Sequence, residues 1–135
     1  MPLDTLIVDD SESFRRLLRA RLESLGCQIV AQAANSEAAL PLFRIHNPRL
    51  VTLDLVMTEA DRFGAKQLFS TIRSESPETA ILVISARSRH SDASSFLAAG
   101  AIGYLEKSFM DFDKVATVLK RIFPEIEAIP SARCN

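Results

Sequence analysis

The sequence predicts an α/β fold in which five parallel strands alternate with five helices that cover both faces of one sheet. Short apolar runs typical of buried strands recur along the chain, and a segment with apolar residues at helical spacing follows each of them. A helix that joins two strands of one sheet makes a right-handed crossover, which leaves the strands parallel. The predicted strands are 6–8, 28–31, 50–53, 80–84 and 102–105.

The first two helices have clear signals at their ends. The first begins at Ser11 or Ser13, whose side chain can accept a hydrogen bond from a free backbone amide, and it ends at Gly26. Asn35 and Ser36 offer the same kind of cap to the second helix. The residues predicted to face the sheet are Phe14, Leu17, Leu18, Leu22 and Leu25 in the first helix and Ala39, Leu42 and Phe43 in the second.

The helices of the second half differ in strength. A polar loop at 57–64 precedes a helix that begins at Ala65 and is stopped before Pro77. The next helix is weak, because it is rich in serine, a poor helix former, and it ends at Gly100. An amphipathic helix at 112–123 is the last element. The residues predicted to face the sheet are Leu68, Phe69 and Ile72, then Ala93, Phe96 and Leu97, and finally Val115, Val118, Leu119, Ile122 and Phe123.

Composition limits the class of protein. A chain of 135 residues can bury one core, and we expect a single domain at 1–123 followed by a loose tail at 124–135. The net charge of -1 argues against general binding to nucleic acid or to a membrane surface, and no apolar run approaches the roughly 20 residues that span a bilayer. The first residues lack a signal peptide, so we expect a cytoplasmic protein in which Cys27 and Cys134 are free thiols.

Polar residues follow four of the predicted strands at the point where each strand ends. Asp9 and Asp10 follow the first strand, Asp54 the third and Ser85 the fourth. Lys107 follows the fifth strand, with Glu106 between the strand and the lysine. The carboxyl ends of parallel strands share one edge of the sheet, and ligands of such folds bind there. The sequence therefore predicts a site that combines clustered carboxylates with a lysine and a hydroxyl.

Clustered carboxylates repel one another, so they take up protons or bind a cation. A hard divalent ion such as Mg²⁺ fits oxygen ligands best. Asp10 and Asp54 can bind such an ion directly, Asp9 can hold a bound water, and a backbone carbonyl near Val56 can complete the set. An aspartate beside the ion can also attack a phosphoryl donor, and a cation then has to bind the phosphoryl oxygens. Lys107 has the required charge, and Ser85 can donate a hydrogen bond to the same oxygens.

These motifs carry a family resemblance. Val8-Asp9-Asp10, Asp54 with Leu55-Val56-Met57, Ser85-Ala86 and the run from Gly100 to Lys107 resemble, in order and spacing, the receiver domain of bacterial two-component response regulators. The resemblance covers about Leu3 to Phe123. It implies the flavodoxin-like, CheY-like fold with strand order 2-1-3-4-5.

The resemblance also implies a role for each matching residue. Asp54 is the implied phosphoacceptor, Lys107 the phosphate contact, and Mg²⁺ the cofactor. Metal binding is implied for Asp9, Asp10, Asp54 and the backbone carbonyl of Val56. Ser85 and Tyr104 are the implied switch pair. Val56 and Arg87 are implied to control the lifetime of the phosphoryl group.

The predicted function is that of a single-domain response regulator, a phosphoacceptor without turnover. A histidine kinase or a phosphotransfer protein donates the phosphoryl group to Asp54. The change then reaches the surface formed by the weak helix at 91–99, the strand that bears Tyr104 and the helix at 112–123, where a downstream protein binds. A homodimer is a further option; direct contact with nucleic acid or a membrane is not expected.

Several alternatives stay open. Asp9 and Asp10 can simply cap the first helix and Asp54 can be a solvated loop residue, although their joint occurrence with Lys107 favours a functional site. A small-molecule phosphatase would need a second acid where Val56 stands. The chain can also be the receiver part of a larger transcriptional regulator.

A receiver that binds its partner without phosphorylation is a further alternative. Thr58 and Ser108 stand where the family usually has proline. Without proline, the Lys107-Ser108 peptide is expected to be trans, because a cis bond there costs about 2.5 to 4 kcal/mol.

Overall fold

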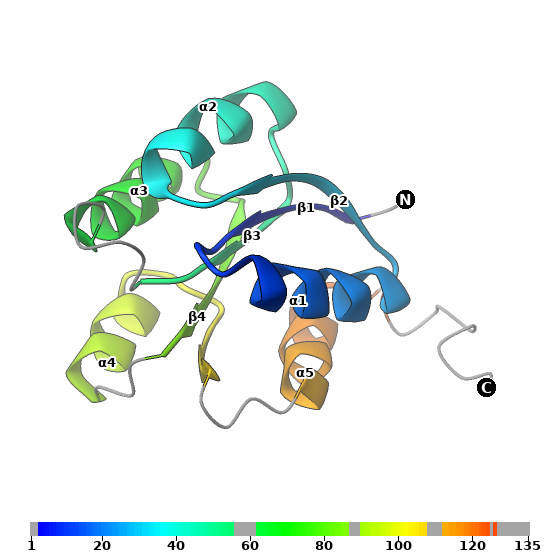
Figure 1. Cartoon of the computed structure of the whole chain (residues 1–135). Helices are drawn as coiled ribbons and strands as arrows, with labels where there is room; N and C mark the ends of the chain where they lie inside the picture. Colours follow the sequence, from blue (N-terminus) through cyan, green and yellow to red (C-terminus); the bar gives the residue numbers. More distant parts are fainter. Residues whose placement is uncertain (1–2, 56–61, 87–89, 108–111, 125, 127–135) are drawn as a thin grey trace.

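Five parallel strands form one sheet in the order β2-β1-β3-β4-β5, which confirms the predicted class and strand order (Figure 1). The computed structural model describes residues 3–55, 62–86, 90–107, 112–124 and 126, with the backbone alone at 62–63 and 90–92. The strands are β1 (Leu3–Val8), β2 (Cys27–Ala33), β3 (Leu50–Leu53), β4 (Ala80–Ser85) and β5 (Gly103–Glu106). The helices are α1 (Glu12–Ser24), α2 (Ser36–His46), α3 (Arg62–Glu75), α4 (His90–Ala98) and α5 (Phe112–Ile122).

The helices lie in two layers with the sheet between them. Figure 1 shows α1 and α5 on one side of the sheet and α2, α3 and α4 on the other. Neighbouring residues of a strand point to opposite faces, so Leu50 packs in the core under α1 and α5 while Val51 packs in the core under α2, α3 and α4. The central strands are therefore buried on both faces, as their apolar sequences predict.

Register brings the ends of the strands to one edge. Val8 of β1 pairs with Leu53 of β3, and the backbone amide of Asp54 donates to the carbonyl of Val8 at 3.0 Å. On the other side of β1, the amide of Asp9 donates to the carbonyl of Ala33 at 2.9 Å. The backbone at both aspartates is thus held by the neighbouring strands at the point where their side chains enter the site.

The caps of the first two helices are as predicted. Ser11 caps α1, and its hydroxyl accepts from the amide of Phe14 at 3.2 Å. Asn35 caps α2, and its side chain accepts from the amide of Ala38 at 2.7 Å. Because Ser11 ends the turn that follows Asp10, the cap also sets the distance between the acidic pair and the helix.

The predicted start of α3 at Ala65 is wrong. The helix begins at Arg62, so Gly64 lies in its first turn instead of in the preceding loop. Glycine lowers helix stability, but the amides of a first turn lack helical partners in any case, so the position tolerates it. The rest of the predicted loop at 57–61 lies outside the described residues.

Three residues assigned to buried helix faces are exposed instead. Leu17 is 60% exposed, Leu97 48% and Ile122 45%. Each adjoins a buried residue, respectively Leu18, Phe96 and Phe123. Successive helical residues point about 100° apart, so the exposed member of each of these pairs lies outside the arc of the helix that faces the sheet.

The core extends beyond the end of α5. Packing continues to Ile126, which is buried in the core under α1 and α5, three residues past the predicted boundary at Phe123.

Cys27 is buried and free as predicted, and burial raises the pKa of its thiol to about 11. Cys134 lies outside the described residues. Among the described residues, no helix has the length and apolar character needed to cross a bilayer.

Candidate functional site

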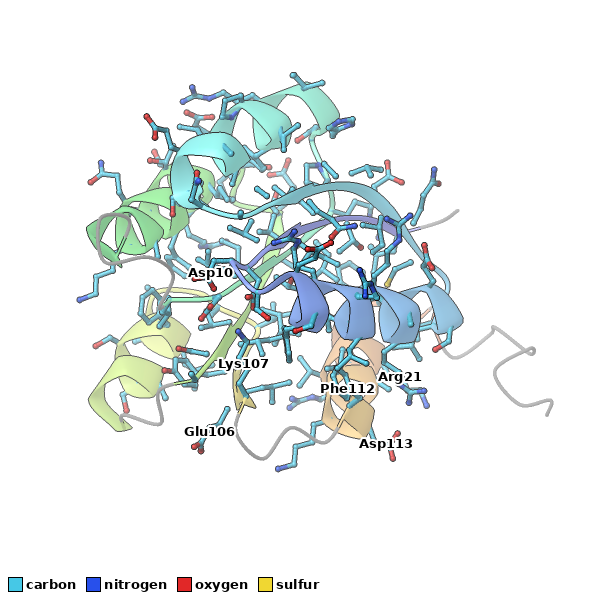
Figure 2. All side chains as sticks on the ribbon, in the orientation of Figure 1. Asp10, Arg21, Glu106, Lys107, Phe112 and Asp113 are labelled. Atoms are coloured by element: carbon cyan, nitrogen blue, oxygen red, sulfur yellow. The ribbon has the colours of Figure 1, made fainter. Side chains whose placement is uncertain are left out.

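Three carboxylates meet at the carboxyl edge of the sheet. Asp9, Asp10 and Asp54 each place one oxygen within 4.8 Å of the other two. Asp9 and Asp54 are only 2% exposed, whereas Asp10 is open to solvent. Figure 2 shows Asp10, after β1, at the same edge as Lys107, after β5. The predicted cluster therefore exists, and two of its members are taken out of water.

Lys107 is the cation that balances the buried pair. Its Nζ lies 2.9 Å from Oδ2 of Asp9 and 3.4 Å from Oδ2 of Asp54, and its side chain is 16% exposed. Burial disfavours the charged ammonium, but the hydrogen bond to Asp9 and the nearby charge of Asp54 outweigh it and raise the pKa of Lys107. The site thus holds a fixed positive charge beside the two buried carboxylates.

An aromatic ring covers another side of the ammonium. The Nζ of Lys107 lies 4.5 Å from the ring centroid of Phe14, a cation–π distance. Phe14 in turn lies against Phe112, with ring centroids 6.0 Å apart and planes at 30°. Sequence reasoning placed Phe14 on the sheet-facing side of its helix and missed this contact, because no local pattern links residues so far apart in the chain.

Arg15 is a second residue that sequence reasoning missed. Its Nη1 donates to the backbone carbonyl of Asp9 at 2.6 Å, and its Nε donates to Oε1 of Gln32 at 3.1 Å. The amide of Ser11 donates to Oδ1 of Asp9 at 2.9 Å. Asp9 is therefore held through its backbone and through both carboxylate oxygens, since Lys107 binds the other.

The donor set fits a hard divalent cation. All three groups offer carboxylate oxygens, and a hard divalent ion held by them would be open to water on the side of the exposed Asp10. Soft or imidazole-preferring metals would need sulfur or nitrogen ligands, which this acidic cluster does not contain.

Comparison with known proteins assigns the family. The profile of the response regulator receiver domain matches residues 5–120. The chain belongs to the response regulator receiver family. It is 36% identical over 120 residues to the probable transcriptional regulator ycf27 of Porphyridium aerugineum, covering 87% of this chain and 48% of that protein. The receiver thus spans about half the length of this curated relative.

Solved structures agree with the assignment. CheY in the CheX-CheY-BeF3-Mg+2 complex from Borrelia burgdorferi matches with a TM-score of 0.81 and 29% identity, covering 91% of this chain and 90% of that one. A response regulator of the LuxR family from Aurantimonas sp. SI85-9A1 matches with a TM-score of 0.80 and 25% identity, covering 93% of this chain and 87% of that one. This receiver is therefore a protein of two-component signalling.

The remaining predicted residues of the receiver lie at the end of β4, on β5 or outside the described residues. Ser85 is fully buried at the end of β4 and pairs in register with Glu106, the residue before Lys107. Tyr104 is half-buried on β5 and packs against the core under α2, α3 and α4. Val56 and Arg87, the predicted modulators, lie outside the described residues, as do Thr58 and Ser108.

Proposed function

We propose that this receiver accepts a phosphoryl group on Asp54 from a histidine kinase or a phosphotransfer protein in a Mg²⁺-dependent reaction. The observation that carries the proposal is the contact of Lys107 with both Asp9 and Asp54 inside the acidic cluster. A lysine that only stabilised the fold would not require three carboxylates around one point. We place the reaction in the cytoplasm, with no turnover beyond slow loss of the phosphoryl group.

The reaction transfers a phosphoryl group between two nucleophiles. An Oδ atom of Asp54 forms the new bond to phosphorus, and the bond from phosphorus to the donor's imidazole nitrogen breaks. The electron pair of that bond stays on the nitrogen, which then takes up a proton from solvent. Burial of Asp54 lowers the number of waters that can compete as nucleophiles or hydrolyse the acyl phosphate.

The residues around Asp54 have separate tasks in this reaction. Lys107 offsets the charge of the phosphoryl oxygens, and Ser85 is the proposed hydroxyl donor to one of them. Asp9, Asp10, Asp54 and the carbonyl of Val56 would hold Mg²⁺, which supplies further positive charge at the transferring group.

The proposed output surface is α4, β5 and α5. Among the described side chains of α4, Phe96 is the one large residue that is buried, while Leu97 is exposed. The ring of Phe96 meets the ring of Phe69 edge-on, with the two ring centroids 5.0 Å apart. A helix anchored by so few groups can change position at low cost when Ser85, at the end of β4, moves toward a phosphoryl group. A downstream protein that prefers one position would then bind according to phosphorylation.

A receiver within a larger transcriptional regulator is the second candidate. It is favoured by the name of the relative from Porphyridium aerugineum, a probable transcriptional regulator, and by the match, which covers only 48% of that protein. The same transfer to Asp54 would then act on an attached domain instead of on a separate protein.

Incubation with acetyl phosphate tests the proposal. Intact-mass spectrometry should find one stable phosphoryl group per chain with Mg²⁺ and none with EDTA. Release of inorganic phosphate with continuous turnover would indicate a phosphatase, and absence of any label would indicate a receiver that acts without phosphorylation.

Amide exchange tests the output surface separately. Beryllofluoride with Mg²⁺, a phosphoryl mimic, should change protection between residues 87 and 107. Changes confined to the segment after Asp54 would exclude α4 and β5 as the route.

A further inference from the structure

The ammonium of Lys107 is enclosed by two kinds of group that respond differently to a ligand. Asp9 and Asp54 pair with it through carboxylate oxygens, and the face of the Phe14 ring covers it at 4.5 Å. A cation or a phosphoryl group at the cluster uses the carboxylate oxygens. The ring of Phe14 binds neither ligand, so its contact with Lys107 does not compete with them.

The ring itself is held in place by α5. Phe112, the first residue of α5, lies 6.0 Å from Phe14, and Arg21 of α1 pairs with Asp113 at 2.9 Å. Figure 2 shows Phe112 and Asp113 at the start of α5, opposite Arg21 on α1. These contacts join the two helices on the side where Lys107 leaves β5, which limits the positions that the ring can adopt.

We propose that Phe14, backed by Phe112, is a positioning residue for Lys107, which it holds over Asp54 when the carboxylates are engaged by ligands. A long lysine side chain loses much rotational freedom when it is fixed in a complex, and a side chain that is already confined loses less. The apolar ring also keeps water from one side of the ammonium, which strengthens its attraction to anions. The inference rests on the proposed function in one respect, because the anion that Lys107 binds is taken to be a phosphoryl group.

The contact can be measured without any ligand. Protons above an aromatic face are shifted upfield, so the ε-methylene signal of Lys107 should lie upfield of those of the exposed Lys66, Lys114 and Lys120. Phe14→Leu keeps an apolar side chain but removes the ring, and it should return the signal to the position of the exposed lysines. Phe14→Tyr keeps the ring and should keep the shift. A Lys107 signal at the exposed position in the wild-type protein would overturn the proposal.

The consequence for binding is measured with beryllofluoride at saturating Mg²⁺. Phe14→Leu should weaken beryllofluoride binding about two- to five-fold, the range expected for a partly exposed cation–π contact, and leave the dissociation constant for Mg²⁺ alone unchanged. Phe14→Tyr should bind beryllofluoride as tightly as the wild-type protein does. The dissociation constant of Phe112→Leu should lie between those of wild type and Phe14→Leu. Phe123→Leu is the matched control, because it removes a similar contact with Arg49, whose Cζ lies 5.2 Å from the Phe123 ring at the other end of α5.

Each result separates the positioning role from the phosphoacceptor function. Equal loss in Phe14→Leu and Phe14→Tyr, or in the Phe123→Leu control, would overturn the positioning role, as would an equal loss of Mg²⁺ affinity. If the wild-type protein shows the upfield signal but binds no beryllofluoride, the positioning contact stands and the phosphoacceptor function fails.

Discussion

Replacing Lys107 by methionine should destabilise the protein strongly in the absence of Mg²⁺. The change removes the cation that lies 2.9 Å from Asp9 and 3.4 Å from Asp54, so the two buried carboxylates lose the positive charge that Lys107 supplies. Breaking a buried ion pair from one side typically costs 3–5 kcal/mol. We expect about 3 kcal/mol, because water reaches the 16% of the Lys107 side chain that is exposed. For a domain of this size, that loss corresponds to a fall in Tm of roughly 10 °C.

Urea unfolding followed by circular dichroism measures this free energy directly. Arg44→Met is the matched control, since it removes the cation from the exposed pair with Glu75 and should cost much less. Mg²⁺ should raise the free energy of unfolding of Lys107→Met by more than it raises that of the wild-type protein, because the ion supplies the missing positive charge. A loss below about 1 kcal/mol, or a loss equal to that of Arg44→Met, would refute the assignment of Lys107 as the charge partner of a buried cluster.

The remaining predictions concern the metal carboxylate, pH and one glycine. Asp10→Ala should raise Tm without Mg²⁺, because it removes a carboxylate within 4.8 Å of two others, and should abolish stabilisation by Mg²⁺; unchanged Mg²⁺ affinity would place the metal elsewhere. The raised pKa of Lys107 means that its contribution to stability is complete below about pH 10.4 and lost as pH rises through the folded-state value, so urea titrations should show an alkaline decline that is smaller in Lys107→Met. The buried thiol of Cys27, whose pKa is raised to about 11, adds an alkaline decline that both proteins share. Gly100→Ala should cost about 1–3 kcal/mol, because the φ of +113° is strained for alanine and its Cβ would meet the Arg73 guanidinium at 2.7 Å; in an Arg73→Ala background part of the loss in Tm should disappear.

The acidic site was predictable because a parallel sheet converts positions in sequence into positions in space. Asp9, Asp54 and Lys107 follow strands whose ends share one edge, so the fold class places all three at that edge. Their contacts depend also on the strand order, which puts β1 beside β3. The family resemblance added the role of each residue, which strand pattern and charge could not supply. That resemblance is now supported by the family profile over residues 5–120.

The misplaced details have a common physical origin. Helical periodicity indicates the direction of a side chain only to within a broad stripe, so Leu17 and Leu18 were both placed on the buried face although only Leu18 is buried. Gly64 was assigned to the polar loop before Ala65, yet a first helical turn tolerates glycine. The contact between Phe14 and Lys107 depends on the packing of α1 against α5, which no local pattern encodes.

The position of the phosphoryl group decides whether Asp54 is the phosphoacceptor. After incubation with acetyl phosphate and Mg²⁺, borohydride reduces an aspartyl phosphate to homoserine, which peptide mass spectrometry locates by sequence. We expect homoserine at Asp54 alone and no label of any kind in Asp54→Asn, since an amide is a poor nucleophile. Homoserine at Asp9 or Asp10, or an undiminished mass gain in Asp54→Asn, would contradict the assignment of Asp54 as the phosphoacceptor.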